Sequence, residues 1–86
     1  MPEISRFFGI VIKMYWDDHN PPDFHAFYAG EQALIDIATL SLFAGRLAPR
    51  ALGLVIEWAN LHQEELLADW RRAQGQEPLN AIDPLR

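Results

Sequence analysis

The sequence is organised around a polar corner at residues 17–25, which reads Asp17-Asp18-His19-Asn20-Pro21-Pro22-Asp23-Phe24-His25. Two of the three histidines lie in this corner, together with three carboxylates and two adjacent prolines. The prolines donate no backbone hydrogen bond, and the residue before each proline favours extended conformations. Apolar stretches lie on both sides, so we expect a stiff loop between two strands.

The stretch before the corner, residues 7–16, is rich in β-branched and aromatic residues, which favours a strand. The odd positions are mixed in character, so we expect their face to be partly open. Gly9 marks a bulge or a bend in this strand. The even positions share one apolar face, which we expect to meet the core: Phe8, Ile10, Ile12, Met14 and Trp16.

Residues after the corner continue the sheet. Alternating apolar positions predict strands over residues 24–28 and 31–38, and a less regular one over residues 42–47. The turn between the first two of these is Ala29-Gly30, in which glycine can supply a positive φ. We therefore expect an antiparallel meander of three or four strands within residues 7–47.

The hydrophobic period changes after the sheet. Residues 49–74 repeat apolar positions at about 3.6 residues per turn, Pro49 suits a first helical turn, and Gly75 is a natural stop. A continuous helix of this length would be about 37 Å long, so it either overhangs the sheet or breaks near Asn60-Leu61-His62. The fold class is α+β: the chain is a single domain over residues 1–86, with one long helix packed on one face of the sheet and an extended arm at 75–86.

A second apolar row on the helix consists of Leu54, Trp58 and Leu61, well around the helix from the main stripe. One helix on one sheet does not easily cover both rows. Either the arm or a sheet edge covers the extra row, or the row is a surface for a partner or for self-association into a homo-oligomer. In the second case Trp58 would be its anchor, because large aromatic residues dominate interface energetics.

The composition of the chain limits the kinds of partner that we expect it to bind. The net charge of -5 counts against nucleic-acid binding and favours a neutral or basic protein partner. The chain has no cysteine, so it has no disulfide framework and no thiolate metal site. No apolar run approaches the roughly 20 residues that span a bilayer, and the N-terminus lacks signal-peptide features. We expect a soluble cytoplasmic protein without a membrane partner.

The chain resembles the bacterial family known as domain of unknown function 4160, and the resemblance covers nearly the whole chain. Its most specific parts are the polar corner and the Asp36-Ile37 pair. The matching segments are residues 4–15, residues 17–22 with Phe24-His25, Ala33-Leu34-Ile35-Asp36-Ile37, Pro49-Arg50-Ala51-Leu52 and Glu57-Trp58-Ala59.

This resemblance implies a protein partner rather than a reaction. Members of the family look like stand-alone proteins of this size. Their genes often lie beside those of a second small family, domain of unknown function 2442, and such pairs resemble toxin–antitoxin modules. The family commonly has histidine at the position of Asp23, so this chain departs from a role that needs three clustered histidines.

We also consider a metal site, an enzyme active site and a purely structural loop at the polar corner. His19 and His25 are the weak candidates for a metal site, but no established ligand spacing is present, and we expect no cofactor. As an enzyme, the chain would be a nuclease-like hydrolase, with or without a metal ion, in which His19, His25 and Asp18 act as acid, base or orienting group. The structural reading is a loop closed by Asp17 or Asp18 and stiffened by the prolines.

Two classes of function therefore remain. We favour a protein-interaction subunit of a small regulatory or toxin–antitoxin-like pair over the His/Asp-centred hydrolase. Exposure of Leu54, Trp58 and Leu61 would support the first class. Convergence of His19 and His25 on one open cleft with a nearby cation would support the second.

Overall fold

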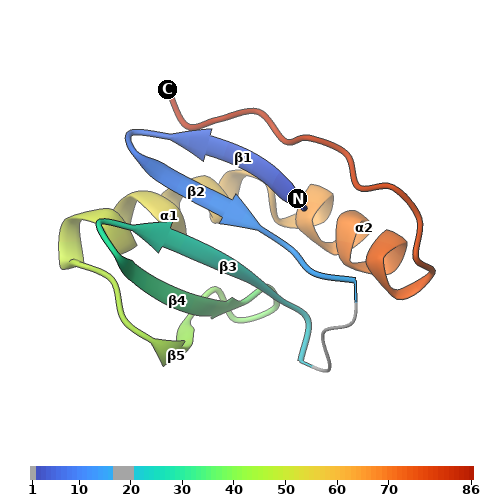
Figure 1. Cartoon of the computed structure of the whole chain (residues 1–86), viewed down its shortest axis with the longest axis horizontal. Coiled ribbons are helices and arrows are strands. Elements are labelled where there is room, and N and C mark those ends of the chain that lie inside the picture. Colours follow the sequence, from blue (N-terminus) through green and yellow to red (C-terminus); the bar gives the residue numbers. More distant parts are fainter. Residues whose placement is uncertain (1, 17–20) are drawn as a thin grey trace.

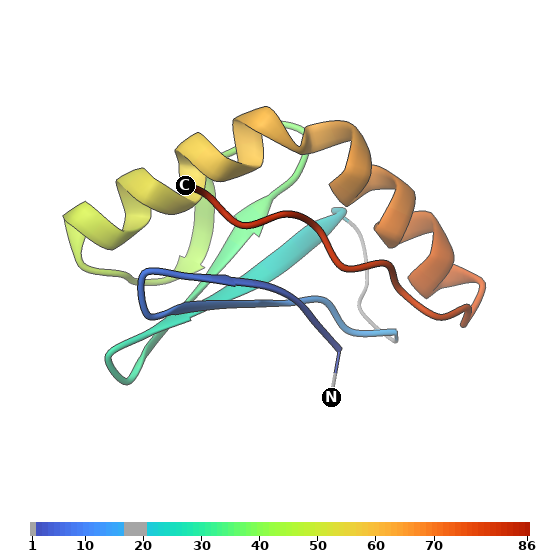
Figure 2. The same cartoon turned by 90° about the horizontal axis from the view of Figure 1, so that it is seen from above.

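The computed structural model describes residues 2–16 and 21–86, which form a five-stranded antiparallel sheet and two helices. The strands lie in chain order across the sheet (Figure 1) and are β1 (Glu3–Phe7), β2 (Ile10–Lys13), β3 (Asp23–Tyr28), β4 (Glu31–Asp36) and β5 (Leu42–Gly45). The helices α1 (Pro49–Leu61) and α2 (Gln63–Gln74) lie together on one face of the sheet (Figure 2). The α+β class is thereby confirmed.

The strand count differs from the expected three or four because the chain reverses within residues 7–16. Phe8 and Gly9 have φ angles of 51° and 81°, and they form a two-residue turn between β1 and β2. Positive φ at both central residues is what a type I′ hairpin turn requires, and its twist matches that of the flanking strands. The predicted strand over residues 7–16 therefore contains only the last residue of β1, then the turn and β2, and the sheet begins at Glu3 instead of Phe7.

The expected core face is confirmed in its centre and wrong at its ends. Ile10, Ile12 and Met14 are fully buried, whereas Phe8 and Trp16 lie at the surface. Phe8 is exposed because the turn at Phe8 and Gly9 interrupts the alternation. The expected core face of the later strand is confirmed, since Ala33, Ile35 and Ile37 are all fully buried.

The single long helix is wrong, and the chain breaks at His62, within the segment that the length argument singled out. The His62 backbone lies outside helical geometry, with φ −124° and ψ 24°. The next residue anchors the break, because the Gln63 side-chain amide donates to the carbonyl oxygens of Ile37 and Ala38 at 2.7 and 3.2 Å. These bonds tie the start of α2 to the end of β4.

One hydrophobic core joins the sheet, both helices and the C-terminal arm. The arm runs back beside β1 and past both helices, as the two views agree (Figures 1 and 2). Ile82 and Leu85 are buried in this core, and Leu79 packs against it. The arm is extended, as expected, and it packs on its own domain.

Gly45 is the last residue of β5, and its position has no room for a side chain. Its φ is 75°, and an added Cβ would lie 2.1 Å from the backbone oxygen of Gln32. We expect Gly45→Ala to lower the free energy of unfolding by about 3 kcal/mol, because left-handed strain and a backbone clash add together.

Urea unfolding monitored by circular dichroism measures this loss, with Gly30→Ala as the matched control. Gly30 also has a positive φ, but an added Cβ would have no atom within 4 Å. The control should therefore lose only the conformational part, about 1–2 kcal/mol. Equal losses in the two variants would contradict the close approach of Gly45 to β4.

Candidate interaction site

The polar corner is described only in part. Asp17, Asp18, His19 and Asn20 lie outside the described residues, so their predicted roles stay predictions. Pro22 is described and fixes the second half of the corner, because its carbonyl oxygen accepts a hydrogen bond from the Ile37 backbone N–H at 2.9 Å. The corner therefore continues directly into the β3–β4 pair.

Asp23, at the start of β3, is buried and lies opposite Asp36 of β4. The Asp36 carboxylate accepts backbone hydrogen bonds from Ala38 at 2.7 Å and Thr39 at 3.0 Å, and thereby closes the turn after β4. This explains an acidic residue at the end of an apolar strand in structural terms. Among the described residues, no group of three or more histidine, aspartate or glutamate side chains could hold a metal ion.

His25 is buried between aromatic residues of β3 and of the segment after β2. Its ring meets the edge of Tyr15 at 4.6 Å and stacks on Phe27 at 6.3 Å between centroids. Its Nδ1 lies 2.9 Å from the side-chain amide nitrogen of Gln32. Lys13 is directly opposite His25 in the β2–β3 register. The imidazole is therefore held in place at the sheet surface.

The predicted apolar row on α1 is not one surface, which corrects the assignment of Trp58 as its exposed anchor. Trp58 is fully buried and packs against Phe7 and Phe24, with ring centroids 5.3 and 5.8 Å away. Its indole N–H donates to the carbonyl oxygen of Asp83 in the arm at 2.8 Å. The arm covers this part of the row, as the alternative expectation held.

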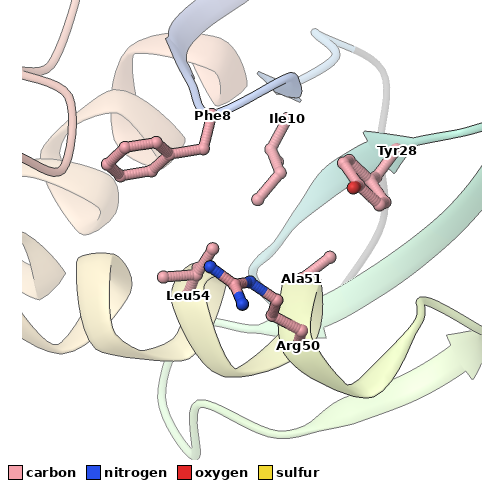
Figure 3. A pocket seen from close by; sticks show the side chains of 6 residues that line it. All are labelled: Phe8, Ile10, Tyr28, Arg50, Ala51 and Leu54. Carbon is pink, nitrogen blue, oxygen red and sulfur yellow. The ribbon is translucent and has the colours of Figure 1, made fainter.

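The other two members of that row have different surroundings. Leu61 is 66% exposed at the end of α1. Leu54 is half-buried and lies one turn before Trp58. Leu54 lines a pocket of about 280 Å³ (Figure 3), and the residues around this pocket are Phe8, Ile10, Tyr28, Arg50, Ala51 and Leu54. We call this the Phe8 pocket.

The Phe8 pocket lies between the ends of two β-hairpins and the first turns of α1. The side chains from the sheet face those from the helix across the opening (Figure 3). Ile10 and Ala51 are buried and form its floor, whereas Phe8 is 61% exposed at its rim. Sequence reasoning missed this site because it placed Phe8 on the core face of a continuous strand.

The backbone of Phe8 is unusual for an aromatic residue. Its φ of 51° lies in the left-handed region, where asparagine, aspartate and glycine are enriched and bulky residues are rare. Its ring meets the edge of Phe7 at 6.4 Å, yet most of its surface remains in solvent. The sequence signal for this turn is the dipeptide Phe8-Gly9, which lies between two apolar runs. It occupies the two central positions at which hairpin turns favour Asn-Gly.

Arg50 is the positive charge of the pocket and is not neutralised by any described carboxylate. Three other arginines have acidic partners: Arg6 with Glu3 at 2.8 Å, Arg46 with Glu31 at 2.9 Å and Arg72 with Asp69 at 2.8 Å. The hydrogen bond to Arg6 lowers the pKa of Glu3 and raises the pKa of Arg6. The first turn of α1 contains no acidic residue that could pair with Arg50.

These features define a small α+β protein whose described surface has an apolar pocket with an unpaired guanidinium. The family model "Domain of unknown function (DUF4160)" matches residues 9–71, which is most of the chain, and the chain belongs to this family. No curated protein and no solved structure matches it. Across residues 2–16 and 21–86, neither helix has the length and apolarity needed to cross a membrane.

Proposed function

We propose that the chain is a cytoplasmic protein-interaction subunit of a small regulatory or toxin–antitoxin-like pair, and that the Phe8 pocket binds the partner. The observation that carries this proposal is the exposed Phe8 ring at a backbone position that disfavours aromatic residues. Violations of local sequence preference concentrate at functional or strained sites. A residue whose ring is mostly in solvent gains little stability from being there, so a binding role accounts for it better.

The size of the pocket is compatible with one side chain of a partner. Its volume of about 280 Å³ is at the lower end of the range of about 300–1,000 Å³ for ligand pockets. Its apolar walls suit one large apolar side chain of the partner. Tryptophan, tyrosine and arginine are the residue types most enriched among binding hot spots, and the pocket has two of them in Tyr28 and Arg50. Phenylalanine, here Phe8, is enriched in interfaces as well.

Arg50 determines which charge the partner should place at the pocket. A partner segment that places a carboxylate beside its apolar anchor would neutralise a guanidinium that the described part of the chain leaves unpaired. The net charge of -5 would at the same time favour a partner that is neutral or basic as a whole. The proposed partner therefore has a local acidic group within a neutral or basic protein, encoded next to this chain.

Light scattering on the purified chain, alone and mixed with the product of the neighbouring gene, tests this proposal. We expect a stable complex of defined mass. Arg50→Glu should weaken it at least about tenfold, because attraction becomes repulsion. Arg71→Glu is the matched control, since Arg71 is also exposed but lies on α2, which does not line the pocket. Two unassociated masses, or equal weakening by both substitutions, would contradict the proposal.

The hydrolase remains a second candidate because of one observation. Lys13, a cation that could bind phosphate, lies directly opposite His25. Against it, the His25 ring is buried and its Nδ1 contacts Gln32. RNA cleavage by the wild-type chain that is lost in both His19→Ala and His25→Ala would favour this candidate. No cleavage, or cleavage unaffected by these substitutions, would remove it.

A further inference from the structure

Residues 77–86, which we call the strap, occupy a groove whose walls come from distant parts of the chain. Within the described residues, and apart from the bond from Glu77 N to Arg72 O at the helix end, four hydrogen bonds join the strap to these walls. They run from Trp16 Nε1 to Glu77 O at 2.9 Å, from Asn80 N to Asp69 Oδ1 at 2.9 Å, from Ile82 N to Ile4 O at 2.8 Å and from Trp58 Nε1 to Asp83 O at 2.8 Å.

All four bonds reach backbone atoms of the strap and none reaches its side chains. Side-chain specificity comes instead from Leu79, Ile82 and Leu85, which repeat every three residues and contact the core. Only the bond from Ile82 N to Ile4 O joins two backbones, so the strap is bound mainly by side chains of the groove that grip its backbone and by the burial of its spaced apolar anchors. The groove therefore has the chemistry of a peptide-binding site that already holds its ligand.

The strap depends on a single tight reversal for its position. It leaves the end of α2 and turns back along the same helix (Figure 2). Gln76 adopts a left-handed backbone with φ 56°, although glycine or asparagine is usual at such a helix end. The Gln76 and Glu77 backbone N–H groups cap α2 through Ala73 O and Arg72 O. A short strained hinge of this kind favours exchange of the segment between copies.

We propose that the groove is a binding site which a second copy of this chain can fill with its own residues 77–86, so that two chains exchange straps and form a reciprocal dimer. The second copy is the occupant that the chemistry specifies, because its strap carries the same three anchors at the same spacing. Each subunit then completes the site of the other. Exchange of an identical element between two copies is a low-cost route to a dimer.

The first test uses the full chain with Ile82→Asp, which weakens its own strap and leaves the groove intact. A fluorescent peptide of residues 77–86 is added, and its anisotropy is measured. We expect binding at least about 100-fold tighter than to the wild-type chain, whose tethered strap competes at millimolar effective concentration. The same peptide carrying aspartate at the position of Ile82 is the control and should not bind.

The second test shortens the hinge in the full chain. Deleting Gly75 and Gln76 removes the reversal, so the strap cannot return to its own groove. Light scattering should report twice the monomer mass, and adding Ile82→Asp to the deletion should restore the monomer. A folded Ile82→Asp chain that binds no peptide would overturn the proposal, as would an unfolded one that the peptide does not refold. A hinge-deleted chain that stays monomeric would overturn exchange with a second copy.

Discussion

Replacing Trp58 by alanine is expected to lower the free energy of unfolding by about 3–5 kcal/mol, the range for large aromatic residues removed from a core. Trp58 is fully buried and contacts the rings of both Phe7 and Phe24. The substitution also removes the indole donor that bonds to Asp83 O, which loosens the strap. A small domain has only about 5–15 kcal/mol of stability, so the loss is a large fraction of the total.

Urea unfolding measures this change. It is monitored by the circular dichroism of the backbone, because the substitution itself alters the tryptophan fluorescence. Leu61→Ala is the control on the same helix, because Leu61 is 66% exposed and its truncation should stay within about 0.5 kcal/mol. A loss below about 1 kcal/mol for Trp58→Ala would mean that the strap does not cover a packed indole. A large effect of Leu61→Ala would show that Leu61 is covered in solution.

Replacing Phe8 by asparagine is expected to weaken the partner complex by about 30-fold or more, equivalent to about 2 kcal/mol for a binding hot spot. The same substitution should leave the free energy of unfolding unchanged or raise it by up to about 1 kcal/mol. Asparagine tolerates the left-handed conformation that Phe8 adopts, and Asn-Gly is the favoured pair in this hairpin turn. Loss of binding without loss of stability separates a binding role from a structural one.

Ala29→Asn is the matched control for this substitution. Ala29 and Gly30 have φ angles of 51° and 81°, the same values as Phe8 and Gly9, but Ala29 does not line the Phe8 pocket. The control should match the stability change and leave the affinity unchanged, as measured by isothermal titration calorimetry. If Phe8→Asn binds like the wild type, or if it destabilises the fold, then Phe8 is a structural residue.

A strand could be predicted from the sequence wherever every second residue is apolar and faces the core. Ala33, Ile35 and Ile37 alternate with polar residues or with Leu34, and all three are buried as expected. The turn at Phe8 and Gly9 was missed because apolar residues continue on both sides of it, so the strand pattern has no visible interruption. The hydrophobic pattern predicts which residues are buried, whereas the turn depends on backbone conformation. Gly9 was the only residue that indicated this turn.

The candidate site was less predictable than the fold because it depends on contacts between distant segments. Trp58 has the helical spacing of a row that ends at the exposed Leu61, but it is buried by Phe7, Phe24 and the strap, which come from distant parts of the sequence. The break at His62 similarly depends on the Gln63 amide reaching carbonyl oxygens beyond β4. Neither contact has a local sequence signal, since no proline or glycine marks the break.

Mapping the partner onto the chain by amide chemical shifts tests whether the Phe8 pocket is the surface that binds it. The chain is labelled with ¹⁵N and titrated with the unlabelled product of the neighbouring gene. The Phe8 pocket predicts that the largest shifts fall on the Phe8–Ile10 turn and on the Arg50–Leu54 turns of α1. Shifts centred on Lys13, His25 and Phe27, or no shifts at all, would contradict it.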